Sequence, residues 1–266
     1  MIIAVLGATG EMGSKVAQKV RRQGHELVSV SRSEGVDVYT GEGLPAALAG
    51  TDAAIDCLNM MSLSAKKAGD YFGRTSRNVV DASQVAGVSR LVCTSIAGAA
   101  DPEVKKMFGY YKGKAVQERV YLKGKAVQER VYLQSGADCV VVRSTQWFQF
   151  LEVLMGMASV GPVALLPKMM MAPVSAERVA SLLVETAVSG NQHEGKTLTI
   201  RGPETGYAAD FVKRQLAAGG HVAGKSPRWV GSAPYMGSAI ARGGLVPSGG
   251  IVDDTAFSEY LESLSR

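Results

Sequence analysis

Three glycines near the start of the chain have the spacing of a phosphate-binding turn. Residues 2–13 read IIAVLGATGEMG, in which an apolar run leads into Gly7, Gly10 and Gly13. A helix-like pattern follows, so the segment predicts a strand, a tight turn and a helix N-terminus, which together suit the pyrophosphate of a dinucleotide. The alternative is a tight turn needed only for packing. The predicted dinucleotide contacts are Gly7, Ala8, Thr9, Gly10, Glu11, Met12 and Gly13.

The residues after the second predicted strand bear on which dinucleotide would bind. An acidic residue there would bond the adenosine ribose hydroxyls of NAD. This chain has Ser31, Arg32 and Ser33 instead. An arginine can pair with a 2′-phosphate and serines can donate to it, so these residues favour NADP(H) over NAD(H). Glu34 competes with this interpretation, because it could serve a ribose if the loop turned back.

A tyrosine and a lysine with Y-x-x-x-K spacing are the candidate acid–base pair. Tyr110 and Lys114 are four residues apart, so both side chains face the same side of a helix. A lysine ammonium close by favours the phenolate form of the tyrosine and can also hold a ribose hydroxyl. The same spacing recurs at Tyr121 and Lys125, and only one pair can serve a single site.

Further candidates lie where predicted strands end. Thr94 and Ser95 end one strand and could hydrogen-bond a substrate carbonyl, with Thr94 also near the cofactor. Leu58 and Asn59 end another strand and are expected to contact the cofactor. The residues after the last strand of the series could line a substrate pocket or could belong to the core, and the sequence favours neither interpretation. They are Gln146, Trp147, Phe148 and Phe150.

An identical repeat falls on the helix that carries the tyrosine and the lysine. KGKAVQERVYL occupies 112–122 and again 123–133. Eleven residues make about three helical turns and roughly 16 Å, with a phase drift of about 20°, so one longer helix is feasible. Because this helix joins two strands, one end must overshoot the sheet or one copy must loop out. Gly124 costs about 1 kcal/mol against Ala in a helix interior, which favours a break there. We expect the first copy to keep its place, with the surplus toward the C-terminal end.

Strand and helix patterns alternate along the first 145 residues. Strands are predicted at 2–6, 26–31, 53–58, 90–94 and 138–143, and helices at 11–23, 44–49, 65–86 and 108–134. Repeated β-α-β units predict an α/β fold with a doubly wound parallel Rossmann sheet, which binds ligands at the carboxyl ends of its strands.

After Thr145 the alternation weakens. Helices are predicted at 147–158, 175–189 and 207–218, a strand at 196–201, and a loop at 219–252. We therefore predict a nucleotide-binding domain at 1–145, which carries the repeat. A substrate-side region at 146–266 would pack on it and include returning elements of the fold.

Composition and charge bear on the possible partners and on the cellular compartment of the protein. The net charge of +5 is mild and the basic residues are scattered, so no nucleic-acid partner is expected. Cys57, Cys93 and Cys139 lack metal-binding spacing and read as buried thiols in a reducing compartment, so no metal site is expected. No apolar run reaches 18 residues and the N-terminus lacks a basic flank, so neither a membrane span nor a signal peptide is expected. These features predict a cytoplasmic protein with a small-molecule substrate; they leave the oligomeric state open.

Four segments in order resemble the atypical short-chain dehydrogenase/reductases of the NmrA-like group. They are GATGEMG at 7–13, SIAGA at 95–99, YYKGKAVQE at 110–118 and VVVRSTQWFQF at 140–150, and the match covers most of residues 1–190. The resemblance implies a Rossmann fold with a small C-terminal substrate region and NAD(P) on the glycine turn. It also implies Arg32 at the adenosine end and Lys114 or Lys125 at the nicotinamide ribose. The duplicated helix has no counterpart in the group.

The expected function is an NAD(P)H-dependent oxidoreductase acting on an apolar carbonyl, quinone or conjugated substrate. In this interpretation Tyr110 is the acid, Lys114 its electrostatic support, and Ser95 or Thr94 a hydrogen-bond donor; Tyr121 and Lys125, the second pair that the repeat creates, are the other candidates. Some members of the group lack the tyrosine and only sense dinucleotides, so a non-enzymatic redox sensor is one alternative. An epimerase or isomerase that uses bound NAD is another.

Overall fold

A computed structural model describes residues 1–60, 62, 64–99, 116–189, 197–219, 221–234 and 236–264, with the backbone alone for 116–120. The described residues divide into two compact units. The first comprises Met1–Ile96, Val116–Arg143 and Ala176–Leu198, and the second the described parts of Ala97–Ala115, Ser144–Ser175 and Thr199–Arg266. No helix in this part of the chain is long and apolar enough to cross a membrane.

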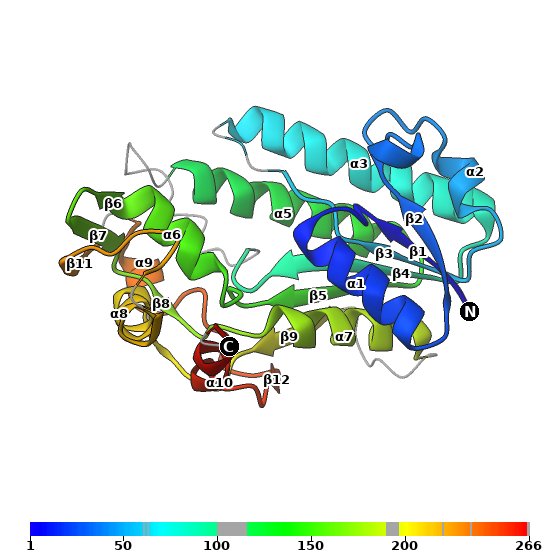
Figure 1. Cartoon of the computed structure of the whole chain (residues 1–266). Coiled ribbons are helices and arrows are strands. Elements are labelled where there is room, and N and C mark those ends of the chain that lie inside the picture. Colours follow the sequence, from blue (N-terminus) through cyan, green and yellow to red (C-terminus); the bar gives the residue numbers. More distant parts are fainter. Residues whose placement is uncertain are drawn as a thin grey trace. The chain divides into compact units, whose positions relative to one another are not determined.

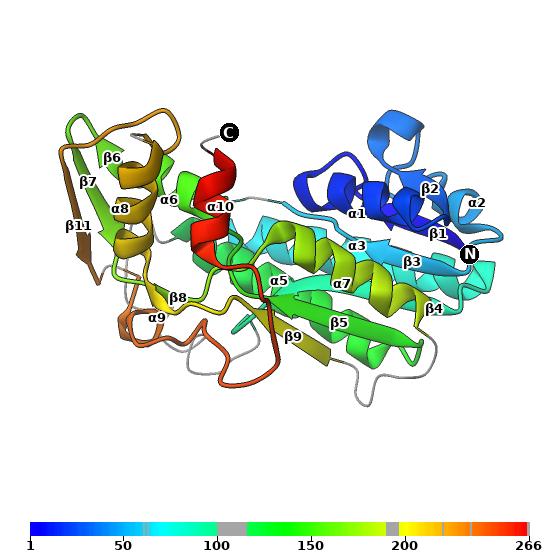
Figure 2. The ribbon, with the colours of Figure 1, turned by 60° about the horizontal axis from the view of Figure 1, so that its bottom comes forward.

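The first unit alternates strands with helices, as the sequence predicts. Its elements are β1 (Ile2–Leu6), α1 (Glu11–Arg22), β2 (Glu26–Val30), a 3-10 turn (Arg32–Glu34), α2 (Leu44–Leu48), β3 (Ala53–Asp56), α3 (Ala65–Ala86), β4 (Arg90–Ile96), α5 (Val116–Gln134), β5 (Cys139–Ser144), α7 (Ala176–Val188) and the start of β9 (Thr197–Arg201). Helices α3 and α5 lie side by side on one face of the strands, with α1 and α7 on the other (Figures 1 and 2).

The order in which successive strands are added to the sheet reverses at β1. The hydrogen-bonded order is β12-β9-β5-β4-β3-β1-β2. Strand β1 pairs in parallel with β2 on one side and with β3 on the other, and β3 pairs in parallel with β4. In such sheets the point where the order reverses opens a crevice at the carboxyl ends of the strands. The α/β Rossmann-like prediction is confirmed, and the turn after β1 lies at this switch point.

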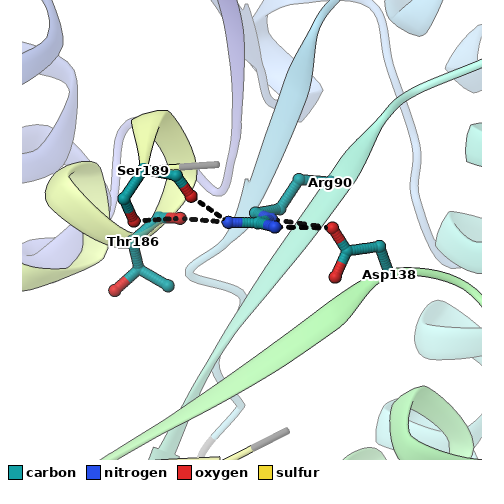
Figure 3. Close-up of polar contacts among 4 residues, drawn as sticks. All are labelled: Arg90, Asp138, Thr186 and Ser189. Carbon is teal, nitrogen blue, oxygen red and sulfur yellow. Dashed lines mark hydrogen bonds and ion pairs between the residues drawn. The ribbon is translucent and has the colours of Figure 1, made fainter. Parts of the chain in front are cut away.

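A buried arginine ties together the opposite, amino edge of the sheet. Arg90 begins β4, and its Nε and Nη2 donate to Asp138 Oδ2 at 2.9 and 2.7 Å. Its Nη1 donates to the carbonyls of Thr186, at 3.4 Å, and Ser189 at the end of α7 (Figure 3). A cation at a helix C-terminus is favourable because the last carbonyls lack partners within the helix. This network fixes α7 to the sheet at the edge away from the glycine turn.

Helix α5 departs from the prediction at the junction of the two copies. It runs without a break through Gly124, so the break favoured by the sequence is wrong. The residue is buried, and a β-carbon there would meet Phe72 and Ala68 of α3. Gly124 therefore lets two helices approach closely. The predicted helix start at 108 lies outside the described residues.

The second unit contains the elements that follow the Rossmann strands. They are α6 (Phe150–Ala158), β6 (Ser159–Val160), β7 (Val163–Pro167), β8 (Met170–Met171), β10 (Gly206–Tyr207), α8 (Ala208–Gly219), β11 (Trp229–Ala233), α9 (Ser238–Ala241), β12 (Ile251–Val252) and α10 (Phe257–Leu264). The loop predicted at 219–252 is wrong in part, because β11, α9 and β12 fall within it. Strand β11 forms by parallel pairing with the distant β7, which its own Gly- and Ser-containing sequence does not signal.

Candidate functional site

The glycine turn has the backbone geometry that the sequence predicts. Gly7 has φ of +75°, a left-handed value that favours glycine, and its N–H donates to Val30 O at 2.8 Å. Gly10 is the N-cap of α1. A β-carbon at Gly13 would lie 2.0 Å from Gly7 O, so only glycine lets α1 begin this close to β1.

The turn presents an exposed edge that fits an anionic ligand. Thr9, Gly10 and Glu11 are exposed, whereas Ala8 and Met12 are buried in the core. The first N–H groups of α1 have no partner within the helix, and its positive dipole end favours negative charge. Backbone donors and unobstructed glycine therefore suit the pyrophosphate of a dinucleotide at this position.

The residues after β2 form a short 3-10 turn beside the glycine turn. Arg32 and Ser33 are exposed, and Ser31 is buried with its Oγ 2.8 Å from Ser33 Oγ. Burial raises the pKa of the nearby Tyr71 to about 12, and the charge of Arg32 opposes that rise. Tyr71 stacks on Tyr39 with ring centroids 6.0 Å apart. Arg32 is thus available at the carboxyl end of β2, with an aromatic pair nearby.

Lys125 lies at the carboxyl ends of β3 and β4. Its Nζ donates to Leu58 O at 3.1 Å, Thr94 O at 3.0 Å and Gln128 Oε1 at 2.8 Å. The ammonium also lies 5.0 Å from the centroid of the Phe72 ring, and the whole residue is 2% exposed. Gly7 contacts the same strand end, since a β-carbon there would lie 3.5 Å from Leu58 Cα. The lysine and the glycine turn therefore share Leu58 as a neighbour.

Tyr121 precedes Lys125 by about one helical turn. Its ring is half-buried and tilted against Phe72, with centroids 6.2 Å apart. Burial raises the pKa of Tyr121 and the carboxylate of Glu11 raises it further. Lys125 and a hydrogen bond with the Asn59 side chain lower it. The phenol therefore stays protonated at neutral pH, and Lys125 and Asn59 partly offset the rise in its pKa that burial causes.

Two buried carboxylates, Asp56 at the end of β3 and Glu129 on α5, join the next turns of α5 to the sheet. Asp56 Oδ2 accepts from Gln128 Nε2 at 2.8 Å and from Tyr132 Oη at 2.7 Å. Glu129 accepts from Ser95 Oγ at 2.5 Å and pairs with Arg143 Nη2 at 2.7 Å. Ser95 is 1% exposed, and its hydroxyl donates a hydrogen bond to Glu129. Every α5 residue in these contacts belongs to the second copy of the repeat.

The second copy occupies the position over the strand ends, and Tyr121 at the end of the first copy lies one turn before Lys125. Our expectation that the first copy keeps this place, with the surplus on the C-terminal side, is therefore wrong. The helix ends at Gln134 with Ser135 N bonded to Tyr132 O, which leaves no room for surplus residues before β5. Tyr110 and Lys114 lie outside the described residues.

The other predicted cofactor contacts lie together at these strand ends. Thr94 is 7% exposed, and its Oγ1 lies 3.8 Å from Cys57 Sγ. Leu58 N donates to Asp56 Oδ1 at 2.8 Å, which fixes the turn after β3. Asn59 is exposed beside Tyr121.

The predicted substrate residues all belong to the second unit. Phe148 is 2% exposed and packs against Phe257 and Tyr260. Trp147 Nε1 donates to Ser144 Oγ at 3.1 Å. Gln146 Oε1 is buried without a hydrogen-bond partner among the described residues, and Phe150 begins α6. Phe148 is thus part of a core, and Gln146 is the member with unused hydrogen-bonding capacity.

Sequence reasoning missed Gln128, Glu129 and Tyr132 as members of this site. With Lys125 they occupy positions i, i+3, i+4 and i+7, which form one stripe on a helix. Polar residues with this spacing, opposite a strand that ends in Asp56, are the signal that would have found them.

Comparison with known protein families gives a match that includes the glycine turn. Over residues 7–189 the chain matches the family described as NAD(P)H-binding. No curated protein matches it significantly.

Solved structures with the same fold share little sequence with the chain. One is a short-chain dehydrogenase/reductase superfamily protein from Agrobacterium tumefaciens with bound NAD, at 16% identity and a TM-score of 0.69, covering 100% of this chain and 96% of that one. Another is an NADPH-dependent quinone oxidoreductase from Escherichia coli complexed with NADPH, at 16% identity and 0.66, covering 99% and 100%. A nucleoside-diphosphate-sugar epimerase from Staphylococcus aureus has 15% identity and 0.65, covering 98% and 100%. The glycine turn at the switch point and the family match over residues 7–189 together show that this chain belongs to the NAD(P)H-binding family.

Proposed function

We propose that this protein is an NAD(P)H-dependent oxidoreductase of the atypical short-chain type, which reduces an apolar carbonyl, quinone or conjugated substrate. The observation that carries the proposal is Lys125, whose ammonium lies at the carboxyl ends of β3 and β4 with Tyr121 one turn before it. The glycine turn contacts the same strand end through Leu58. A phosphate-binding turn and a tyrosine–lysine pair at one sheet edge are what cofactor-dependent carbonyl reduction needs.

The residues of this chain take separate roles in the proposal. Tyr121 is the acid that gives its phenolic proton to the substrate oxygen, and Lys125 supports the phenolate that remains. Thr94 is a candidate donor to the substrate, because its hydroxyl donates to a weak acceptor, Cys57 Sγ, whereas the Ser95 hydroxyl donates to the carboxylate of Glu129. Tyr110 and Lys114 are the alternative pair. The cofactor, when bound, supplies the hydride.

We propose that NADP(H) is preferred over NAD(H). Arg32 and Ser33 are exposed at the carboxyl end of β2, and no acidic side chain occupies positions 31–33. A guanidinium there pairs with a 2′-phosphate, and a carboxylate would repel it.

The test is a titration followed by an activity screen. Quenching of intrinsic fluorescence should show NADPH binding more tightly than NADH, and a panel of quinones and conjugated carbonyls should show stoichiometric NADPH oxidation. Tyr121→Phe should lower kcat by about two orders of magnitude with little change in NADPH affinity, because general acid catalysis is worth about 10²–10⁴-fold. Tyr110→Phe is the matched control and should retain activity. The reverse result would assign the chemistry to Tyr110.

A non-catalytic dinucleotide sensor is the second candidate, and one observation favours it. Lys125 Nζ donates to three acceptors of the protein itself, which uses all three of its N–H groups. An ammonium satisfied in this way can hold the fold together without touching a ligand. Tight NADPH binding with no oxidation across the whole panel, unchanged in Tyr121→Phe, would favour the sensor over the reductase.

A further inference from the structure

We propose that Gln128 and Asp56 are positioning residues that hold the Lys125 ammonium at the carboxyl ends of β3 and β4. What the lysine then does rests on the proposed function, but the positioning itself does not. Neither residue is expected to touch a ligand, because Gln128 is 0% exposed and Asp56 1%.

The Gln128 amide is oriented by different partners at its two ends. Its Oε1 accepts from Lys125 Nζ at 2.8 Å, and its Nε2 donates to Asp56 Oδ2 at 2.8 Å. Turning the amide over would set an N–H against the ammonium and an oxygen against the carboxylate. Only one orientation satisfies both contacts, so the amide acts as a rigid spacer between a cation and an anion.

Asp56 is itself fixed at three points. Its Oδ1 accepts from Leu58 N at 2.8 Å, and its Oδ2 accepts from both Gln128 and Tyr132 Oη. The carboxylate therefore cannot rotate without losing a bond to its own strand end. Buried charges are retained where they are paired and hydrogen-bonded, and the Lys125–Gln128–Asp56 chain is neutral overall.

The Lys125 ammonium is therefore held by a side chain of its own helix as well as by backbone carbonyls at the ends of the strands. Leu58 O and Thr94 O hold the ammonium on the sheet, and Phe72 lies 5.0 Å away across its ring face. Without Gln128 the ammonium keeps only its strand-end carbonyls. The side chain then gains rotamers that take it away from Tyr121.

The primary test compares Gln128→Met with Gln117→Met. Gln117 is the same residue in the first copy, with identical neighbours from 112 to 122, so it is a matched control. A hydrogen-bonded, buried ammonium exchanges its protons slowly and gives a ¹⁵N–¹H signal that exposed lysines lack. We expect one such signal in the wild type, its loss in Lys125→Met and Gln128→Met, and its retention in Gln117→Met. A retained signal in Gln128→Met would overturn the proposal, whether or not the protein has activity.

A second test reverses the polarity of one bond. Asp56→Asn with Gln128→Glu keeps the net charge, because one carboxylate is removed and another is added. The introduced asparagine can donate where the aspartate accepted, and the introduced glutamate still accepts from Lys125. Each single change should raise the Kd for NADPH about tenfold, and the double variant should bind within about threefold of wild type. The slow ammonium signal should weaken in Asp56→Asn, where the Gln128 amide loses its anionic partner, and return in the double variant; Gln128→Glu alone keeps an acceptor for Lys125 and should retain the signal. A double variant no better than the worse single one contradicts positioning.

Discussion

Phe72 of α3 fills the space that a side chain at Gly124 of α5 would need. A β-carbon at Gly124 would lie 2.4 Å from Phe72 Cδ2 and 2.8 Å from its Cε2. The same Phe72 ring lies against Tyr121 and under the Lys125 ammonium. The glycine at the junction of the repeat therefore sets how closely the helix bearing the tyrosine–lysine pair approaches α3.

Gly124→Ala should destabilise the protein in spite of the better helix propensity of alanine. The gain of about 1 kcal/mol from propensity is outweighed by overpacking against an aromatic ring, which costs about 1–3 kcal/mol or more. Gly113→Ala, the same change in the first copy, is the control and should leave stability within about 0.5 kcal/mol. Urea unfolding midpoints measure both. Partial recovery in Gly124→Ala with Phe72→Leu would identify the ring as the cause, and equal midpoints for the two alanine variants would contradict the packing argument.

Removal of one copy of the repeat should leave the site intact. Deleting 112–122 or 123–133 gives the same chain, in which the remaining lysine follows Tyr110 by four residues. The polar stripe of Lys125, Gln128, Glu129 and Tyr132 is unchanged, so it can contact Asp56, Ser95 and Arg143 as before. The nearest changes are Tyr111 in place of the buried Leu122 and Gly109 in place of Val120.

We therefore expect the shortened chain to bind NADPH within about threefold of the full chain, with an equal or higher Tm. Shortening a connection changes its closure entropy by only a fraction of a kcal/mol. The control is the same deletion with the remaining lysine changed to methionine, which should lose binding. A shortened chain that fails to fold would show that the extra copy has become part of the fold.

Helix α3 shows which features the sequence could predict. Its predicted and observed bounds agree at 65–86, because the signals are local: Ser64 Oγ accepts from Lys67 N at 3.3 Å, and Gly87 ends the helix with φ of +72°. The glycine turn was predictable for the same reason. The register of α5 was not, because both copies have identical local signals and differ only in where the flanking chain lets them lie. Asp56 and Glu129 became part of the site through contacts between different elements, 72 residues apart for Asp56 and Gln128 and 34 for Glu129 and Ser95.

Arg32→Ala should reduce the preference for NADPH without affecting NADH. The guanidinium is the group expected to pair with the 2′-phosphate, which NADH lacks, and the residue is exposed, so stability should not change. We expect the Kd for NADPH to rise about tenfold, with the Kd for NADH within about twofold of wild type. Fluorescence titrations at fixed salt measure both, since ion pairs weaken with ionic strength. Arg74→Ala, which removes a cation that lies 4.9 Å from the Tyr39 ring centroid, is the control for a general loss of positive charge. An equal loss for both cofactors would argue against a 2′-phosphate contact.

Alkaline pH should destabilise the protein through the half-buried Tyr71 and the buried Tyr132. Burial raises the pKa of Tyr71 to about 12 and the pKa of Tyr132 well above its usual value of 10. An unfolded chain releases these protons near pH 10 whereas the folded chain keeps them, so unfolding becomes easier as pH rises above 10. The contribution of Tyr71 to stability is thus complete below pH 10 and is lost as the pH rises through 12. Urea midpoints between pH 8 and 12 should be level at first and then fall. The Tyr71→Phe variant cannot titrate at this position, so its urea midpoint should fall less steeply with pH. A wild-type midpoint that stays level to pH 12 would contradict the raised pKa values of these phenols.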